Sequence, residues 1–168
     1  ARVVNEDGND VAPDVVGDLW VCGDSACIGY WNRHEATKRA LRGKWFVTGD
    51  KYRVDSEGYY WYAGRSDDMF KVHGQWVSPL KVESVLLEHE GVREVAVVAA
   101  TDDRGLSCSL AFVVPVGLAN ESLALALLEH AAGNLSPYLV PATVKFVDEL
   151  PKTATGKIQR YLLRDQTG

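Results

Sequence analysis

Cysteine is scarce in this chain, and the three present are not spaced for a metal site or a disulfide framework. Cys22, Cys27 and Cys108 contain no CxxC pair, so the sequence predicts neither a zinc site nor a disulfide-stabilised scaffold. The four histidines also lack metal-ligand spacing, and we expect no metal site in the protein. Reduced thiols are typical of a cytosolic protein, so a cytoplasmic location is expected.

Long apolar runs and an excess of basic residues are missing as well. No segment is long enough to span a bilayer, and no basic-then-apolar signal sequence opens the chain. The net charge is −5 with acids and bases interspersed, which argues against a nucleic-acid or membrane surface as a partner. It leaves room for a small anionic ligand.

The composition supports a folded core. The chain has 168 residues, of which 46% are hydrophobic, and it includes five tryptophans. This length allows one ordinary domain or two small ones. Because the chain opens without a methionine on what reads as a strand, we expect a fragment of something longer.

Residues 1–63 are predicted to be β-rich. Residues 17–23 alternate between apolar and polar over the length of a strand, and residues 55–58 form a turn signal. A short helix is expected over 35–41. Thr48-Gly49-Asp50 follows an apolar strand, which places Asp50 in a turn at the end of that strand.

The stretch from Gly64 to Val77 separates this region from the rest. It begins with Gly, Arg and carboxylates and then alternates apolar and polar residues around His73-Gly74, which predicts a two-residue hairpin turn. A charged joint followed at once by a hairpin indicates a junction between two folding units.

Beyond the junction, strands and helices alternate. Ser78-Pro79 is a helix start and Gly91 a helix stop, and Asn120 is typical of an N-cap. The further elements expected are strands over 93–101, 109–115 and 143–147 and helices over 121–132 and 158–163. This pattern predicts the α+β class, with a small domain whose sheet is covered by helices.

The residues taken alone support only modest roles for the polar side chains. Asp50 reads as an acid that caps its own turn, Tyr62 as an outward-facing strand aromatic, and Arg65 as a surface arginine. Gly156-Lys157 lacks the Ser or Thr and the Gly-rich lead-in of a phosphate-binding P-loop, so that motif is excluded.

Three motifs together resemble the adenylate-forming superfamily of acyl- and aryl-CoA ligases, peptide-synthetase adenylation domains and luciferases. Gly-Arg-x-Asp-Asp-x-x-Lys-x-x-Gly at 64–74 is similar to the hinge motif of that superfamily, with Thr48-Gly49-Asp50 upstream and a Pro-Lys-Thr-x-Thr-Gly-Lys motif at 151–157. The resemblance runs from about Gly17 to Arg160. It implies that 1–63 is the β-rich end of a large N-terminal domain, 64–68 a hinge, and 69–168 a mobile C-terminal α+β domain.

The resemblance also implies roles for the nucleotide-binding candidates. Asp50 would accept both ribose hydroxyls, and Arg65 would contact ribose and phosphate of the nucleotide. Tyr62 stands where the family often places an aromatic against the nucleotide. Lys157 would reach into the active site and neutralise charge that develops between the carboxylate substrate and the α-phosphate.

The resemblance also implies roles for residues of the junction, in the step that transfers the acyl group to coenzyme A. Asp67 resembles the hinge residue about which the C-terminal domain rotates. Lys71, His73 and Gly74 would then line the tunnel for the thiol of coenzyme A, with Gly74 leaving room for pantetheine. His73 stands where the family more often has a small residue; a thiol base and a solvated turn histidine are both open interpretations.

An ATP-dependent aryl- or acyl-CoA ligase is therefore the expected function, with ATP and Mg, coenzyme A and a carboxylate as substrates. An aromatic residue at Trp76 favours the benzoate-CoA ligase branch. The alternatives are a peptide-synthetase adenylation domain, a fatty acyl-CoA ligase or a non-catalytic α+β binding module. Because the phosphate loop and the acyl pocket would lie in the missing N-terminal domain, this fragment alone is expected to be inactive.

Overall fold

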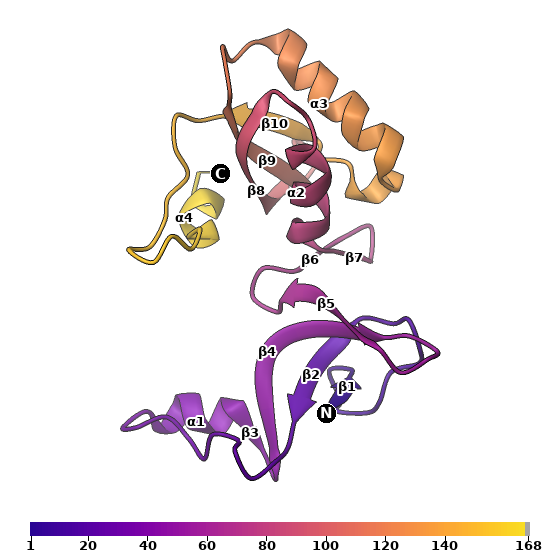
Figure 1. The fold of residues 1–168 in the computed structure, drawn as a ribbon, viewed down its shortest axis with the longest axis vertical. Helices are drawn as coiled ribbons and strands as arrows, with labels where there is room; N and C mark the ends of the chain where they lie inside the picture. The colour runs from indigo at the N-terminus through magenta and orange to yellow at the C-terminus, as the bar shows by residue number, and fades with distance from the viewer. Residues whose placement is uncertain (167–168) are drawn as a thin grey trace. The chain divides into compact units, whose positions relative to one another are not determined.

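The protein folds as two compact units that meet at the bond between Asp67 and Asp68 (Figure 1). This fold comes from a computed structural model that describes residues 1–166, so the last two residues of the expected domain 69–168 lie outside the described range. Each unit has its own sheet and is described by itself.

The first unit is an antiparallel sheet with one short helix. A long central strand, β4, pairs with β2 on one side; on the other side it pairs with β3 near its start and with β5 near its end. β1 extends the sheet beyond β2. The elements are β1 (Arg2–Val4), β2 (Gly17–Val21), α1 (His34–Ala40), β3 (Leu41–Arg42), β4 (Trp45–Val54) and β5 (Tyr60–Arg65).

The second unit opens with the hairpin and continues as a three-stranded sheet with helices. The sheet has the order β10-β9-β8, with β8 antiparallel and β10 parallel to β9. Its elements are β6 (Phe70–Val72), β7 (Gln75–Val77), α2 (Pro79–Leu87), β8 (Val92–Thr101), β9 (Ser107–Pro115), α3 (Glu121–Asn134), the 3₁₀ turn η1 (Pro137–Leu139), β10 (Thr143–Phe146) and α4 (Arg160–Arg164). The predicted α+β class is confirmed.

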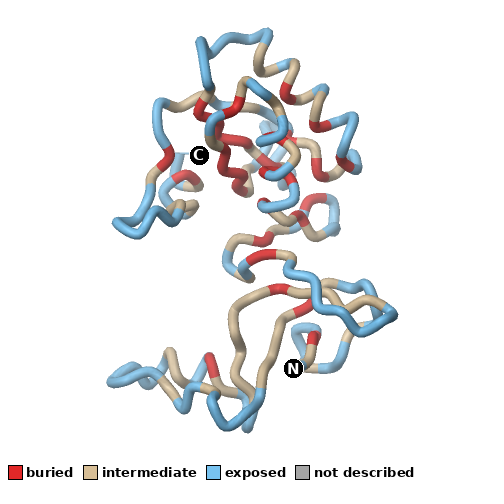
Figure 2. The backbone as a smooth tube through the Cα atoms, in the orientation of Figure 1, coloured by how far each residue is buried: buried red, intermediate tan, exposed pale blue. Residues whose placement is uncertain are grey.

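Alternation along β8 and β9 gives the second unit two apolar cores, one on each face of the sheet. Val95, Val97 and Val113 pack with residues of α2 and α3, whereas Ala96 and Phe112 pack on the opposite face with Leu150, Leu163 and their neighbours. Figure 2 shows the buried segments concentrated in this sheet and in the inner sides of its helices. The helices therefore cover both faces, a detail that the prediction of a sheet covered by helices did not include.

The predicted hairpin turn and helix cap are confirmed in atomic detail. His73 and Gly74 both have positive φ, 48° and 78°, as a two-residue type I′ turn between β6 and β7 requires. Asn120 caps α3 because its side-chain oxygen accepts a hydrogen bond from the Leu123 amide at 2.8 Å.

Among the helix boundaries that differ from the prediction, two have a cause visible in the structure. α2 ends at Leu87 rather than at Gly91, because the His89 amide bonds back to the Leu86 carbonyl and the His89 imidazole accepts the Gly91 amide at 3.1 Å. These contacts turn the chain before the glycine. α4 begins at Arg160 rather than at residue 158, because Ile158 forms a β-bridge to Lys152.

Candidate functional site

Asp50 lies inside β4, which corrects the prediction that it occupies a turn at the end of a strand. Between the cross-strand pairs Trp20–Val47 and Asp18–Lys51, β2 contributes one residue and β4 contributes the Thr-Gly-Asp motif. The motif is thus a bulge in a continuing strand. Bulges re-aim side chains and are frequent beside active sites.

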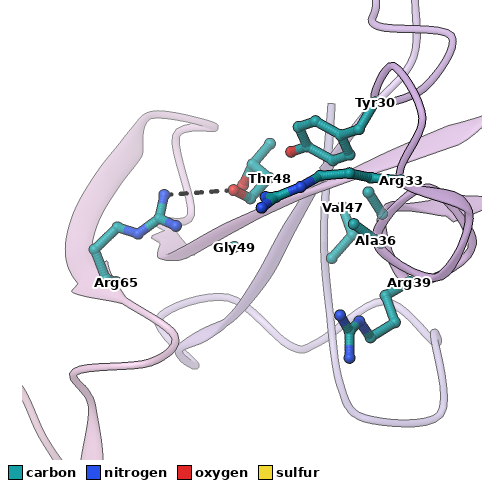
Figure 3. Close-up of a pocket in the computed structure, with 9 residues that line it drawn as sticks. Tyr30, Arg33, Ala36, Arg39, Val47, Thr48, Gly49 and Arg65 are labelled. Carbon is teal, nitrogen blue, oxygen red and sulfur yellow. Dashed lines mark hydrogen bonds between the residues drawn. The ribbon is translucent and has the colours of Figure 1, made fainter. Parts of the chain in front are cut away.

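Asp50 and Arg65 are cross-strand partners joined by an ion pair. The Arg65 Nη1 atom lies 2.9 Å from Asp50 Oδ1 and also donates to the Thr48 carbonyl at 3.5 Å (Figure 3). Gly49, at φ +77°, has no side chain, and a Cβ there would lie 3.1 Å from the guanidinium. The glycine of the motif therefore leaves space for Arg65.

This ion pair is weak enough for a ligand to replace it. The side chains of Arg65 and Asp50 are 49% and 28% exposed. Such a pair contributes about 0–1 kcal/mol. A ligand with hydroxyl or phosphate groups can therefore bind either partner at little cost.

A hollow of about 400 Å³ lies beside Arg65 in the first unit. Two further arginines, Arg33 and Arg39, line it together with Tyr30 (Figure 3). The sequence-based site lacked Arg33 and Arg39. In the sequence, Arg39 stands three residues after Ala36, a spacing that puts both on the same face of a helix. In the structure, both residues line the hollow. The arrangement favours an anionic ligand.

Tyr62 lies on β5 but does not line this hollow. Its side chain is 49% exposed and makes an edge-to-face contact with Tyr52, with ring centroids 5.3 Å apart. This is the geometry of an outward-facing strand aromatic.

Lys157 closes a hairpin-like loop in the second unit. The Thr153 amide donates to the Lys157 carbonyl at 2.8 Å, and the Lys157 amide donates to Thr153 Oγ1 at 3.1 Å. Gly156 turns the chain with φ +81°. Lys157 itself is exposed, and within residues 1–166 no hydrogen bond or ion pair reaches its ammonium. The loop thus fixes the backbone of Lys157 while the side chain is exposed to solvent.

The hairpin presents Lys71, His73 and Gly74 together. Lys71 and Trp76 face each other across the hairpin, with the Lys71 ammonium 4.7 Å from the centre of the indole ring. His73 and Gly74 form the exposed tip. Apart from its own chain neighbours, no atom of residues 1–166 lies within 4 Å of where a Gly74 Cβ would be, so the backbone at the tip is open.

A second hollow, of about 540 Å³, lies beside this hairpin within the second unit. His73, Leu106, Cys108 and Tyr138 are among its lining residues, and most of its wall is apolar. Ser109 also lines it; the Ser109 hydroxyl is buried and has no hydrogen-bond partner among the described residues. A long flexible ligand with occasional polar groups suits such a surface.

Asp67 is exposed in the turn that ends the first unit. In the described part of the chain its side chain makes no hydrogen bond or ion pair, so it does not act as a turn cap. Its neighbour Asp68 behaves differently, because it binds two arginines from the C-terminal helix.

Four charged side chains of the second unit form what we call the Arg160 cluster: Glu83, Arg160, Asp68 and Arg164. Arg160 Nη2 binds both carboxylate oxygens of Glu83, at 2.9 and 2.8 Å, and its Nη1 lies 3.3 Å from Asp68. Arg164 contacts the other oxygen of Asp68 at 3.0 Å. The cluster connects α2, α4 and the first residue of the second unit.

Glu83 is the buried member of the cluster, with only 5% of its surface exposed. Its Oε1 also accepts the Val97 amide of β8 at 2.8 Å. Burial raises the pKa of Glu83 despite the opposing effects of Arg160 and of that amide. The sequence-based prediction of the site did not include Glu83. The signal was available, because Glu83 shares with Pro79, Val82 and Leu86 the helical spacing of the buried face of α2.

Comparison with known proteins finds a family match within the second unit. Residues 81–157 match the family of AMP-binding enzyme C-terminal domains. The match includes the Lys157 loop and all of the sheet, so the resemblance to the C-terminal portion of adenylate-forming acid:CoA ligases, expected from the motifs, is confirmed.

Similarity to aryl-CoA ligases extends beyond the AMP-binding C-terminal domain. A benzoate–CoA ligase of Thauera aromatica is 49% identical over 166 residues, which is 97% of this chain and 32% of that protein. The crystal structure of an anthranilate CoA ligase, AuaEII, in complex with anthranoyl-AMP matches 99% of this chain and 33% of its own, with a TM-score of 0.92 and 41% identity. A benzoate CoA ligase from Burkholderia xenovorans LB400 matches 97% of this chain and 33% of its own, with a TM-score of 0.84 and 45% identity.

The chain therefore spans about a third of the length of the relatives it matches. Among residues 1–166, no helix is long and apolar enough to cross a membrane.

Proposed function

We propose that this chain is the C-terminal part of an AMP-forming aryl-CoA ligase. The observation that carries the proposal is its similarity to benzoate and anthranilate CoA ligases at 41–49% identity over nearly its whole length. The exposed Lys157 loop and the arginine-lined hollow beside Arg65 fit that reaction. The intact enzyme converts a carboxylate, ATP taken as its magnesium complex, and coenzyme A into a CoA thioester, AMP and pyrophosphate.

The first unit contributes to nucleotide binding in this proposal. Asp50 accepts hydrogen bonds from the ribose hydroxyls, and Arg65 leaves its weak contact with Asp50 to bind ribose and phosphate. Arg65 suits this task because its planar fork can hold two oxygens at once. Tyr62 offers an exposed ring for contact with the nucleotide.

Lys157 assists the adenylation step. A carboxylate oxygen attacks the α-phosphorus of ATP, the bond to the β-phosphate oxygen breaks, and pyrophosphate leaves with the electron pair. The ammonium of Lys157 stabilises the negative charge that gathers between carboxylate and phosphate. The support is an ammonium that is exposed on a loop whose backbone is hydrogen-bonded.

Thioester formation uses the junction between the units. Rotation at Asp67 brings the β6–β7 hairpin to the acyl-adenylate, the CoA thiolate attacks the acyl carbon, and AMP leaves. Lys71, His73 and Gly74 line the path of the thiol. Three observations support this: Asp67 lies at the boundary of two compact units, the hairpin tip is open, and an apolar hollow lies beside the hairpin.

The acid is of the benzoate class in this proposal. The support comes from the relatives, which are named for benzoate and anthranilate, and from Trp76 in the hairpin. Since the chain corresponds to only a third of those enzymes, we expect it to be inactive without an N-terminal domain.

The test is carboxylate-dependent pyrophosphate release by the intact enzyme over a panel of aryl, alkyl and amino acids. Replacing Lys157→Ala is expected to lower the rate on benzoate-like acids by ~100-fold or more. A matched control is Lys81→Ala, which removes an exposed lysine of α2 and is expected to change nothing. A peak on alkyl or amino acids would overturn the aryl class, and a full rate in Lys157→Ala would overturn the role of that lysine.

A further inference from the structure

Arg160 connects the Lys157 loop, which serves the proposed adenylation step, with the end of the proposed hinge at Asp68. It lies three residues after Lys157, and its guanidinium contacts Asp68, which directly follows Asp67. The same guanidinium binds Glu83 of α2 through both carboxylate oxygens. One side chain thus joins the lysine loop, the body of the unit and the end of the hinge.

The contacts of the Lys157 loop show why this connection matters. At its start, the loop is held by an ion pair between Lys152 and Glu94 at 2.6 Å and by a bridge from Lys152 to Ile158. After Ile158, Arg160 is the first residue with an ion pair to another element. Between these anchors, residues 153–157 are held by the hydrogen bonds of their own turn, and Ile158 packs against the apolar core beside them.

We propose that Arg160 is a positioning residue that keeps Lys157 at a constant place relative to the hinge end at Asp68. This proposal rests on the adenylation role proposed for Lys157. When the domain rotates, the hinge end, α2 and the lysine loop move as one body, because a single guanidinium binds carboxylates of the first two and belongs to the first residue of α4, which directly follows the loop. Lys157 therefore returns to the same place at the start of each cycle.

The chemistry of the cluster explains why arginine is suited to this position. Its fork binds both oxygens of Glu83 with one edge and Asp68 with the other, whereas the ammonium of a lysine is a single point of charge. The side chains of Arg160 and Glu83 are 14% and 7% exposed, so few water molecules can replace lost contacts. A lysine at this position would keep the positive charge but could not bind Glu83 and Asp68 at the same time with this geometry.

The experiment uses the intact ligase with Arg160→Lys and Asp68→Asn, alone and combined with Lys157→Ala. Each single variant is expected to lower the adenylation rate by ~10–100-fold with little change in the KM for ATP, since small misplacements of a catalytic group have effects of this size. Thioester formation from supplied acyl-adenylate is expected to stay near normal. Arg104→Lys, which changes an exposed arginine in the turn between β8 and β9, away from the cluster and the lysine loop, is the matched control.

The combined variants decide whether Arg160 acts through the lysine. With Lys157 already replaced, Arg160→Lys is expected to cause no further loss of adenylation. A loss by the same factor in both backgrounds would mean that the arginine only supports the fold, and the proposal would be overturned.

Amide hydrogen exchange provides a readout that needs no reaction. Arg160→Lys is expected to speed exchange in residues 151–159 and 68–72 while α3 keeps its protection; unchanged exchange in both segments would also overturn the proposal. If the intact protein released no pyrophosphate with any acid, the proposed function would fail. Exchange would still show whether Arg160 ties the loop to the hinge end.

Discussion

Replacing Arg160 by methionine is expected to destabilise the second unit strongly, because it leaves Glu83 buried without its counter-charge. Arg160 supplies three of the four hydrogen bonds to the Glu83 carboxylate; the fourth comes from the Val97 amide. Removing one partner of a buried ion pair typically costs about 3–5 kcal/mol. Since small domains have a free energy of unfolding of about 5–15 kcal/mol, this loss is a large share of the total.

The loss should depend on pH in a defined direction. Burial already raises the pKa of Glu83 above its ordinary value, so its protonated form favours the folded state. That contribution is fully present below the unfolded pKa and is lost as the pH rises through the higher folded pKa. Without Arg160, which opposes the rise, the pKa of Glu83 should rise further. Arg160→Met should therefore be less harmful at pH 5 than at pH 7.

Urea unfolding at both pH values, followed by circular dichroism, measures these differences. Adding Glu83→Gln to Arg160→Met is expected to restore most of the stability, because the double variant buries no charge at this position. Arg104→Met serves as the control for loss of a surface arginine. A loss below about 1 kcal/mol, the range of exposed pairs, or an equal loss at both pH values would refute the reasoning.

Three further predictions concern other parts of the protein. Leu86→Ala, which empties a fully buried position of α2, is expected to lower the free energy of unfolding by about 2–5 kcal/mol in urea titrations; a loss below ~1 kcal/mol would place Leu86 outside the core. Gly74→Ala should cost about 1–2 kcal/mol in the same assay, because φ is +78° and no neighbour would be touched; an unchanged midpoint would contradict the turn geometry. Iodoacetamide should label Cys108 more slowly than the exposed Cys22 at pH 8, as mass spectrometry can follow, because burial and then Asp102 raise the pKa of the Cys108 thiol; equal rates would disprove this.

Local signals allowed much of the second unit to be predicted. The His73-Gly74 turn and the Asn120 cap depend on interactions within four residues, so short-range chemistry determines them. The end of α2 was misplaced because the imidazole of His89 turns the chain before Gly91, a side-chain contact that spacing does not reveal.

Long-range pairing accounts for what could not be predicted. Asp50 was placed in a turn because Thr-Gly-Asp reads as one; the register against β2 makes it a bulge in a continuing strand. Arg160 meets Glu83 across 77 positions of sequence, and nothing local to either residue announces the contact. The roles of Lys157 and Asp67 remain predictions, since their test is a reaction.

The bond from Glu83 to the Val97 amide also bears on the outer edge of the sheet. β8 is an outer strand, and unpaired amides on outer strands can pair with a second chain. At mid-strand the amide is bound by a carboxylate of the protein's own α2, and Val97 itself is fully buried. A second chain therefore finds no free amide at this position of the edge.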